Sequence, residues 1–122
     1  METAAVENEL GLIRISDRVI AITAQAAALR VPGIAGMGET FLHSLSSVLT
    51  DREREGVHVG FKDGAAVIDL YVCVRHGGRI PAIALQLQEA VKEEIKDSLG
   101  IRTAAVNVNI SGIIFDTGGK SQ

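Results

Sequence analysis

Cys73 and His76 are the two side chains whose types and spacing could perform chemistry most directly. A cysteine three positions before a histidine can supply two ligands to a zinc ion, or a thiol nucleophile with a nearby base. A zinc site needs about four ligands, and no second pair exists, because His43 and His58 are single residues in unrelated segments. The simplest interpretation of Cys73 is a small apolar residue on a strand. The sequence therefore predicts no catalytic residue, no metal site and no cofactor, with a Cys73 nucleophile as the enzyme alternative.

The segment Gly33-Ile-Ala-Gly36 has the pattern G-x-x-G. In RNA-binding domains of the KH type, such a loop joins two helices and lets the backbone approach phosphates. The residues that follow it, Met37, Gly38 and Glu39, bring no positive charge. An RNA-binding module that uses the Gly33–Gly36 loop is kept as the alternative function, and an extended turn that needs small residues is the simpler interpretation.

A set of polar side chains recurs at alternate positions of two apolar segments. Asp69, Tyr71 and Arg75 alternate with aliphatic residues in one segment, and Asn107 and Asn109 do so in the other. Alternation places them on one face of a strand, and the regular pattern favours a sheet with one wet face. We expect this face to meet solvent or another subunit, and these five residues are the predicted interaction face.

Three predicted strands and one hairpin turn determine where these polar side chains lie. Val57, Val59 and Phe61 alternate with His58 and Gly60, and Lys62-Asp-Gly64 follows as a hairpin turn. The return strand places one set of side chains inward, namely Ala66, Ile68, Leu70, Val72 and Val74. The last strand runs from Ala104 to Phe115, with Ala104, Val106, Val108 and Ile110 expected to face inward and Gly112 at a bulge or bend.

Helical spacing predicts the covering layer. A first helix starts at the N-cap Ser16 and stops before Pro32. A second helix begins near Pro81 and runs to Leu99, with Gly100 as the C′ residue that ends it. A short helix over Thr40–Leu49 and a solvated charge run over Asp51–Glu55 are further expectations. Gly11–Ile15 and Ile34–Met37 are expected to be short extended segments. The predicted fold class is α+β: a small, mostly antiparallel sheet with two main helices on one face.

Length and composition narrow the class of protein. A chain of 122 residues is one domain, which we expect at 11–116 between mobile tails at 1–10, which is acidic, and 117–122. The 12 basic and 15 acidic residues give a net charge of −3, so nucleic acid is not an expected partner unless the basic residues cluster. The single cysteine fits a reducing compartment. The acidic N-terminal segment does not resemble a signal peptide. No apolar run is long enough to insert into a membrane.

The order of several short segments resembles the alkaline shock protein family of Gram-positive bacteria, also called the envelope stress response domain. The resemblance runs from about Gly11 to Phe115. The segments that carry it are Ile15-Ser-Asp-Arg-Val-Ile20, Val31-Pro-Gly-Ile-Ala-Gly-Met37, Gly56-Val-His-Val59, Asp69-Leu-Tyr-Val72, Ile80-Pro81 with Gln88-Glu-Ala-Val-Lys92, and Ala105-Val-Asn-Val-Asn109. The region Phe41–Leu49 departs from the pattern, so nothing is transferred there.

The resemblance implies a non-enzymatic structural or interaction protein that is linked to cell-envelope stress. It implies a cytoplasmic location, membrane-proximal through a partner. The expected partners are other copies of the chain, in a homo-oligomer, and a small membrane-anchored protein, with no small-molecule substrate. The family has no catalytic residues to transfer, which agrees with the absence of a catalytic set in the sequence.

Overall fold

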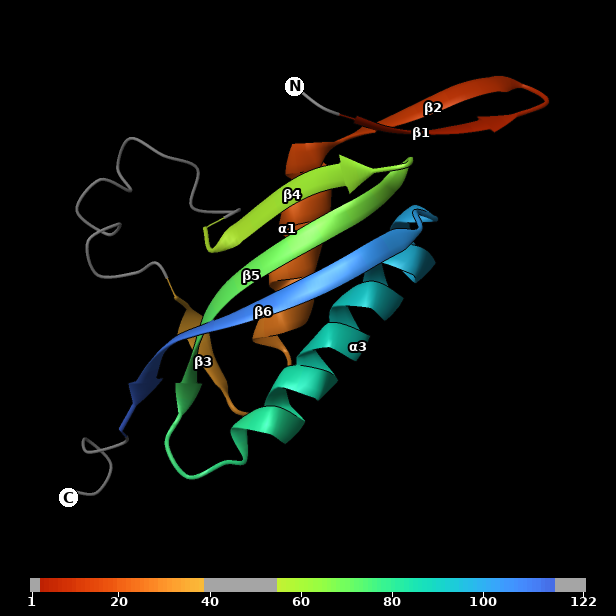
Figure 1. The fold of residues 1–122 in the computed structure, drawn as a ribbon. Coiled ribbons are helices and arrows are strands. Elements are labelled where there is room, and N and C mark those ends of the chain that lie inside the picture. The colour runs from red at the N-terminus through yellow and green to blue at the C-terminus, as the bar shows by residue number, and fades with distance from the viewer. Residues whose placement is uncertain (1–2, 39–54, 116–122) are drawn as a thin grey trace.

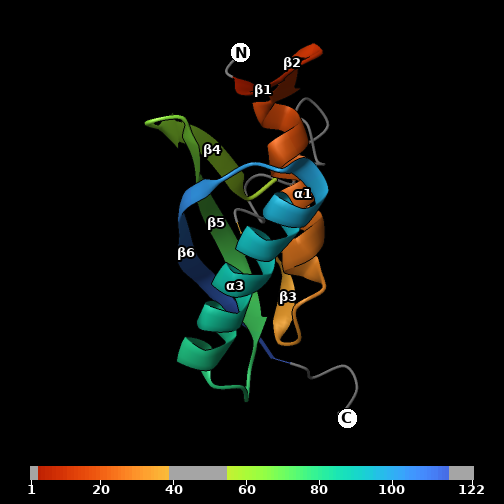
Figure 2. The same cartoon turned by 90° about the vertical axis from the view of Figure 1, so that its right-hand side faces the viewer.

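The computed structural model describes residues 3–38 and 55–115 and has two layers. Figures 1 and 2 show a twisted sheet with both helices, α1 and α3, on the same side of it. The α+β fold class predicted from the sequence is confirmed. The expected helix at Thr40–Leu49, most of the charge run at 51–55 and the tail at 117–122 lie outside the described residues.

The sheet is built around the long central strand β5, Ala65–Arg75. Two shorter strands pair with one side of it, antiparallel and end to end: β4, Val57–Lys62, with the first half and β3, Ile34–Met37, with the second. On the other side β6, Thr103–Ile114, runs parallel to β5. A parallel neighbour needs a long crossover, and the helix between β5 and β6 supplies it. The sheet is thus mostly antiparallel, as predicted, with one parallel pair.

The first helix, α1, spans Asp17–Leu29 and starts as the sequence predicts. The Ser16 hydroxyl accepts a hydrogen bond from the backbone N–H of Val19 at 3.2 Å, and Asp17 adds a negative charge to the first turn. The residues it buries are Ile20, Ala21, Ala24, Ala27 and Ala28. Four of these are alanines, which let the helix axis approach the sheet and the second helix closely.

The second helix, α3, spans Ile80–Leu99 and crosses over from β5 to β6. Pro81 lies in its first turn, and Gly100 ends it with a φ of 70°, a left-handed conformation that glycine adopts at little cost. The buried side chains are Ile83, Leu87, Val91 and Ile95, spaced three or four residues apart. They meet the inner face of β5, where Ala66, Ile68, Leu70, Val72 and Val74 are all fully buried as predicted. This is the core of the protein.

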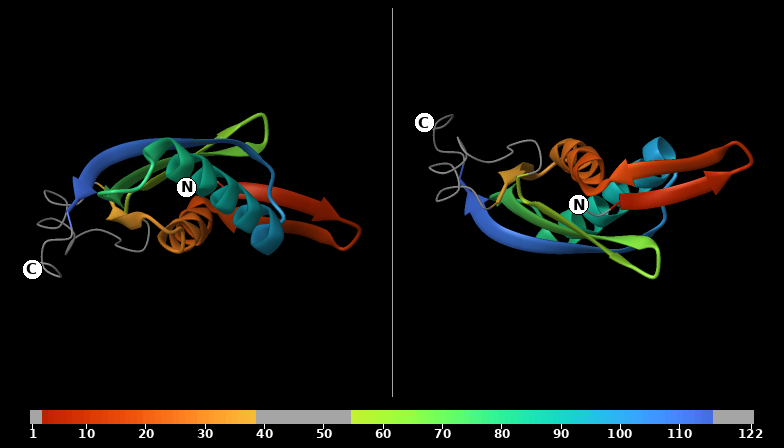
Figure 3. Two further views of the ribbon diagram at one scale, coloured as in Figure 1. Left: turned by 90° about the horizontal axis from the view of Figure 1, so that it is seen from below. Right: turned by 90° about the horizontal axis from the view of Figure 1, so that it is seen from above.

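The N-terminal segment forms a strand where a tail is expected. β1, Thr3–Asn8, pairs antiparallel with β2, Gly11–Ser16, and Figures 1 and 3 show this hairpin extending away from the main sheet. The segment Thr-Ala-Ala-Val-Glu-Asn has weak strand propensity, so its sequence favours a tail. The segment becomes a strand because it pairs with β2. The expected boundary between tail and domain, at Gly11, therefore falls inside the hairpin.

One inward-facing prediction for the last strand is wrong. The register of β6 on β5 shifts at its start, so that Ala66 pairs with Thr103 and Val67 with Ala105. Ala104 is the extra residue of this bulge and is exposed, whereas Val106 is buried as predicted. A second shift skips Ser111 and brings Gly112 opposite Cys73, which confirms the irregularity expected there.

Candidate functional site

The face of the sheet that the helices leave uncovered carries the predicted polar set. The register places Asn107 beside Asp69 and Asn109 beside Tyr71, on neighbouring strands. Asp69 and Tyr71 alternate with the fully buried Leu70 of β5, and the two asparagines alternate with Val106 and Val108 of β6. Their side chains therefore point away from the core. We call Asp69, Tyr71, Asn107 and Asn109, together with His58, the outer sheet face.

Hydrogen bonds hold the two asparagines of the outer sheet face in place. Asn107 Nδ2 donates to Asp69 Oδ1 at 2.8 Å, and Asn109 Nδ2 donates to the carbonyl oxygen of Leu70 at 3.1 Å. Each bond joins β6 to β5. The amide side chains therefore stiffen the parallel strand pair while their remaining polar atoms stay available at the surface.

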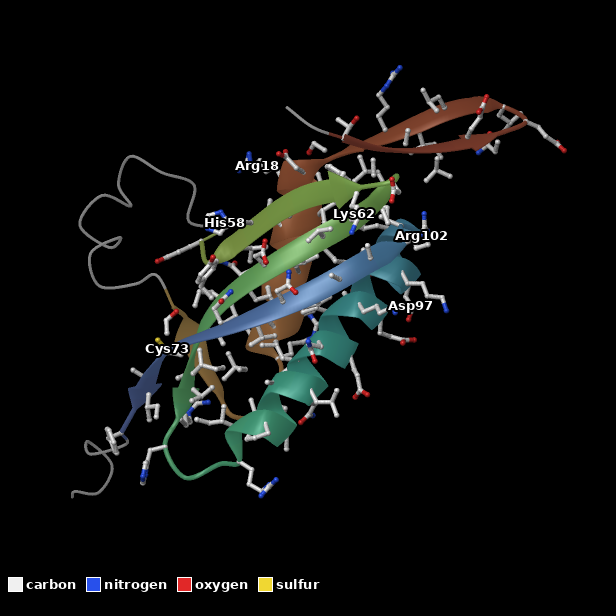
Figure 4. All side chains as sticks on the ribbon, viewed as in Figure 1. Arg18, His58, Lys62, Cys73, Asp97 and Arg102 are labelled. Carbon is white, nitrogen blue, oxygen red and sulfur yellow. The ribbon has the colours of Figure 1, made fainter. Side chains whose placement is uncertain are left out.

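His58 belongs to this face, although it looks isolated in the sequence. Its ring and that of Tyr71 meet edge to face, with centroids 5.3 Å apart and planes at 89°. The hairpin turn could have predicted this position from the sequence. A two-residue turn at Asp63 and Gly64 fixes the strand register, so that His58 lies opposite Asp69. Figure 4 shows His58 on β4 at the edge of the sheet. The pair gives the outer sheet face an aromatic centre.

Arg75, the fifth predicted residue, is engaged elsewhere. Its Nη1 donates to the carbonyl oxygen of Ile34 at 2.9 Å, and its backbone N–H donates to the carbonyl of Gly33. Arg75 thereby fastens β3 to the end of β5. The structure brings together four of the five predicted residues, whereas the Arg75 side chain bonds to the neighbouring strand β3.

The Cys73–His76 pair does not form a reactive site. Cys73 is a buried free thiol, and a side chain at Gly112 would contact its sulfur at 3.3 Å. His76 is exposed and its ring lies 4.5 Å from that of Phe115. Over residues 3–38 and 55–115, no group of three or more His, Cys, Asp and Glu side chains is placed to hold a metal ion. In the described part of the chain, the buried thiol therefore belongs to no group of metal ligands, and His76 lies exposed.

The Gly33–Gly36 segment has a packing role. It connects α1 to β3, and Gly33 has a φ of 96°. A Cβ at Gly33 would lie 2.8 Å from Cδ1 of Ile83 in α3, so a larger residue would force that side chain to shift, and the positive φ also favours glycine. A loop of the KH type joins two helices, whereas Ile34–Met37 here is a strand of the sheet. The arrangement therefore lacks the geometry that the RNA alternative requires.

A charge change at Asn107 tests how much the hydrogen bond between Asn107 and Asp69 contributes to stability. We expect Asn107→Asp to lower the free energy of unfolding by roughly 0.2–1 kcal/mol, because two carboxylates would then face each other across β5 and β6. Raising the salt concentration to 1 M is expected to recover part of this loss, because the pair is exposed. Urea unfolding at low and high salt measures both effects. Asn107→Ala, which removes the hydrogen bond without adding charge, should show no such salt dependence.

In the described part of the chain, neither helix has the length and apolarity needed to cross a membrane.

Several known proteins are similar to this chain. The uncharacterized protein YqhY of Bacillus subtilis is 30% identical over 112 residues, which span 91% of this chain and 83% of that protein. The uncharacterized protein YloU of the same organism is 32% identical over 108 residues, which span 84% and 88%.

A stress response regulator gls24 homolog of Streptococcus pyogenes is 27% identical over 105 residues, which span 84% of this chain and 59% of that protein. Among solved structures, a MamM-CTD variant superposes with a TM-score of 0.49 at 15% identity, over 80% of this chain and 98% of that one. The model of one family matches residues 5–115, nearly the whole chain. The chain therefore belongs to the alkaline shock protein 23 family, which is described as having a cell envelope-related function.

Proposed function

We propose that the protein is a non-enzymatic interaction protein of the cell-envelope stress response. It self-associates into a homo-oligomer and docks to a small membrane-anchored protein, which holds it at the cytoplasmic side of the membrane. Membership of an envelope-related family and the similarity to a stress response regulator support the envelope role. The proposed contact surface is the outer sheet face.

The observation that carries the proposal is the uncovered face of the sheet with its aromatic centre. Tyr71 is half-buried, and His58 packs edge-on against it. Tyrosine is a frequent anchor of protein interfaces, because its ring buries apolar area while the hydroxyl keeps a hydrogen bond. The fixed asparagine amides beside it offer donors and acceptors at little further entropic cost.

A charge at the centre of the outer sheet face should disrupt binding. We expect Tyr71→Glu to reduce self-association by at least about tenfold in dissociation constant, because central tyrosines often contribute 2 kcal/mol or more. Sedimentation velocity over a concentration series measures self-association, and co-sedimentation with native membranes measures docking. The variant's circular dichroism spectrum establishes that it is folded.

Leu85→Glu is the matched control, because Leu85 is exposed on α3 in the opposite layer. It introduces the same charge in place of an apolar side chain and is expected to leave both readouts unchanged. If Tyr71→Glu matches the unmodified protein in oligomer size and membrane recovery, the outer sheet face is not the interface. Loss in the Leu85→Glu protein alone would move the interface to the helical layer.

A further inference from the structure

A pocket with a volume of about 290 Å³ lies where α3 ends and β6 begins, away from the outer sheet face. Lys92, Lys96 and Arg102 surround it, and Ile101 and Thr103 complete the wall. Gln88, one turn before Lys92, donates to the carbonyl oxygen of Val106 at 2.9 Å and so ties the helix to the strand. Figure 4 shows Arg102 at the start of β6.

The three cations at the pocket are not neutralised by acids. Within residues 3–38 and 55–115, Lys92 and Lys96 form no hydrogen bond or ion pair. Arg102 donates through Nη2 to the carbonyl oxygen of Asp63 at 3.3 Å, which fixes its guanidinium but leaves the charge unpaired. The C-terminus of α3 contributes roughly half a negative charge here, far less than three positive charges. Three side-chain cations therefore line the pocket, and this composition suits an anionic ligand.

The floor of the pocket favours an apolar group. Ile101 lines the pocket and is buried, and the two lysines that also line it have long aliphatic stems. Gly100 adds no side chain, and a Cβ built there would meet no atom within 4 Å, so the entrance stays open. A ligand with both a charged head and an apolar chain matches this division.

Thr103 adds a second and independent observation. It is only 7% exposed, and its hydroxyl oxygen has no hydrogen-bond partner in the described part of the chain. A buried hydroxyl is nearly always paired, so its lack of a partner beside a pocket suits a site that a ligand completes. Thr103 also lines the pocket, so its hydroxyl is an uncharged hydrogen-bond donor for an anionic head group.

We propose that this pocket binds an anionic amphiphile, with a carboxylate or phosphate head between Lys92, Lys96 and Arg102 and an apolar chain on Ile101. The site is separate from the outer sheet face, so the proposed function does not depend on it. Through this pocket, an interaction protein would also bind a small molecule, at the opposite end of the sheet.

Titration of the intact protein with soluble probes tests the proposal. Decanoate and decyl phosphate, below their micelle concentrations, are expected to shift the backbone amide resonances of residues 100–103 with saturable binding. The comparison of the two probes tells a carboxylate head from a phosphate head. Decyltrimethylammonium, with the same chain and opposite charge, and inorganic phosphate, with no chain, are expected to bind at least about tenfold more weakly, since both parts of the ligand contribute.

Matched variants decide whether the pocket is the site. A Lys92→Gln, Lys96→Gln double variant is expected to weaken decanoate or decyl phosphate binding by roughly tenfold, because it removes two charge-assisted contacts. Arg79→Gln, at the other end of α3 and roughly 20–26 Å from the two lysines, removes a charge outside the pocket and should bind as the unmodified protein does. All the substituted side chains are exposed, so the fold is retained.

Three results would overturn the proposal: equal binding of the cationic probe, equal binding by the double variant, or shifts confined to residues outside the pocket. Thr103→Val keeps the side-chain shape and removes the unpaired hydroxyl. It is expected to weaken binding while the free protein stays at least as stable, because a buried hydroxyl without a partner is lost. Unchanged affinity in Thr103→Val would remove the hydroxyl from the proposed head-group contacts.

Discussion

Replacing Leu87 with alanine is expected to lower the free energy of unfolding by about 2–5 kcal/mol, a large part of the roughly 5–15 kcal/mol that stabilises a typical domain. Leu87 has no exposed surface and belongs to the core cluster between α3 and the sheet. Truncation loses the transfer free energy of the side chain and leaves a cavity that close-packed neighbours fill only partly. Urea unfolding followed by circular dichroism measures the change.

Leu85 provides the control on the same helix, two residues away and 55% exposed. Leu85→Ala makes the same chemical change at nearly the same cost in helix propensity, so the difference between the two variants isolates burial. We expect Leu85→Ala to stay within about 0.5 kcal/mol of the unmodified protein. Equal losses in the two variants would contradict the packing of α3 described above.

The elements that could be predicted from sequence are those specified by local patterns. The alternation of β5 identifies its inner face from Ala66 to Val74, and the spacing of Leu87, Val91 and Ile95 identifies the buried side of α3. Capping signals at Ser16 and Gly100 fix one end of each helix, because a cap depends only on nearby residues.

The features that the sequence did not predict depend on pairing between distant segments. Strand β1 has little strand propensity and forms because it pairs with β2. The bulge at Ala104 becomes visible only when β6 is aligned on β5. The same division holds for the site. Alternation groups Asn107 with Asn109, but the engagement of Arg75 with Ile34 depends on where β3 docks.

Tyr71 is the residue that joins the fold to the proposed interface, and its backbone shows why. Its N–H donates to the carbonyl oxygen of Gly56 at 2.8 Å, and its own carbonyl accepts from the N–H of Gly38 at 2.6 Å. Gly56 precedes β4 and Gly38 follows β3, so Tyr71 lies where these two strands meet along β5. The position of its ring on the outer sheet face therefore depends on close backbone contacts.

Gly56→Ala is expected to lower the free energy of unfolding by about 2–4 kcal/mol, because two costs add at this position. Gly56 has a φ of 75°, where a side chain is strained, and its Cβ would lie 2.8 Å from the carbonyl oxygen of Tyr71. That oxygen belongs to the backbone of the central strand, so it cannot move aside cheaply. Urea unfolding measures the loss, and sedimentation velocity on the folded variant measures self-association, which should weaken as Tyr71 is displaced.

Two other glycines separate the causes of this expected loss. Gly64 has a φ of 81° but open space around a built Cβ, so Gly64→Ala should cost about 1–2 kcal/mol from the left-handed conformation alone. Gly60 has open space and no positive φ, so Gly60→Ala should be neutral or slightly stabilising within strand β4. A Gly56→Ala loss no larger than that of Gly64→Ala would mean that the sheet yields at Tyr71. In that case the outer sheet face would be a compliant surface. Its side chains would not be preorganised for binding, and this support for an interface there would be lost.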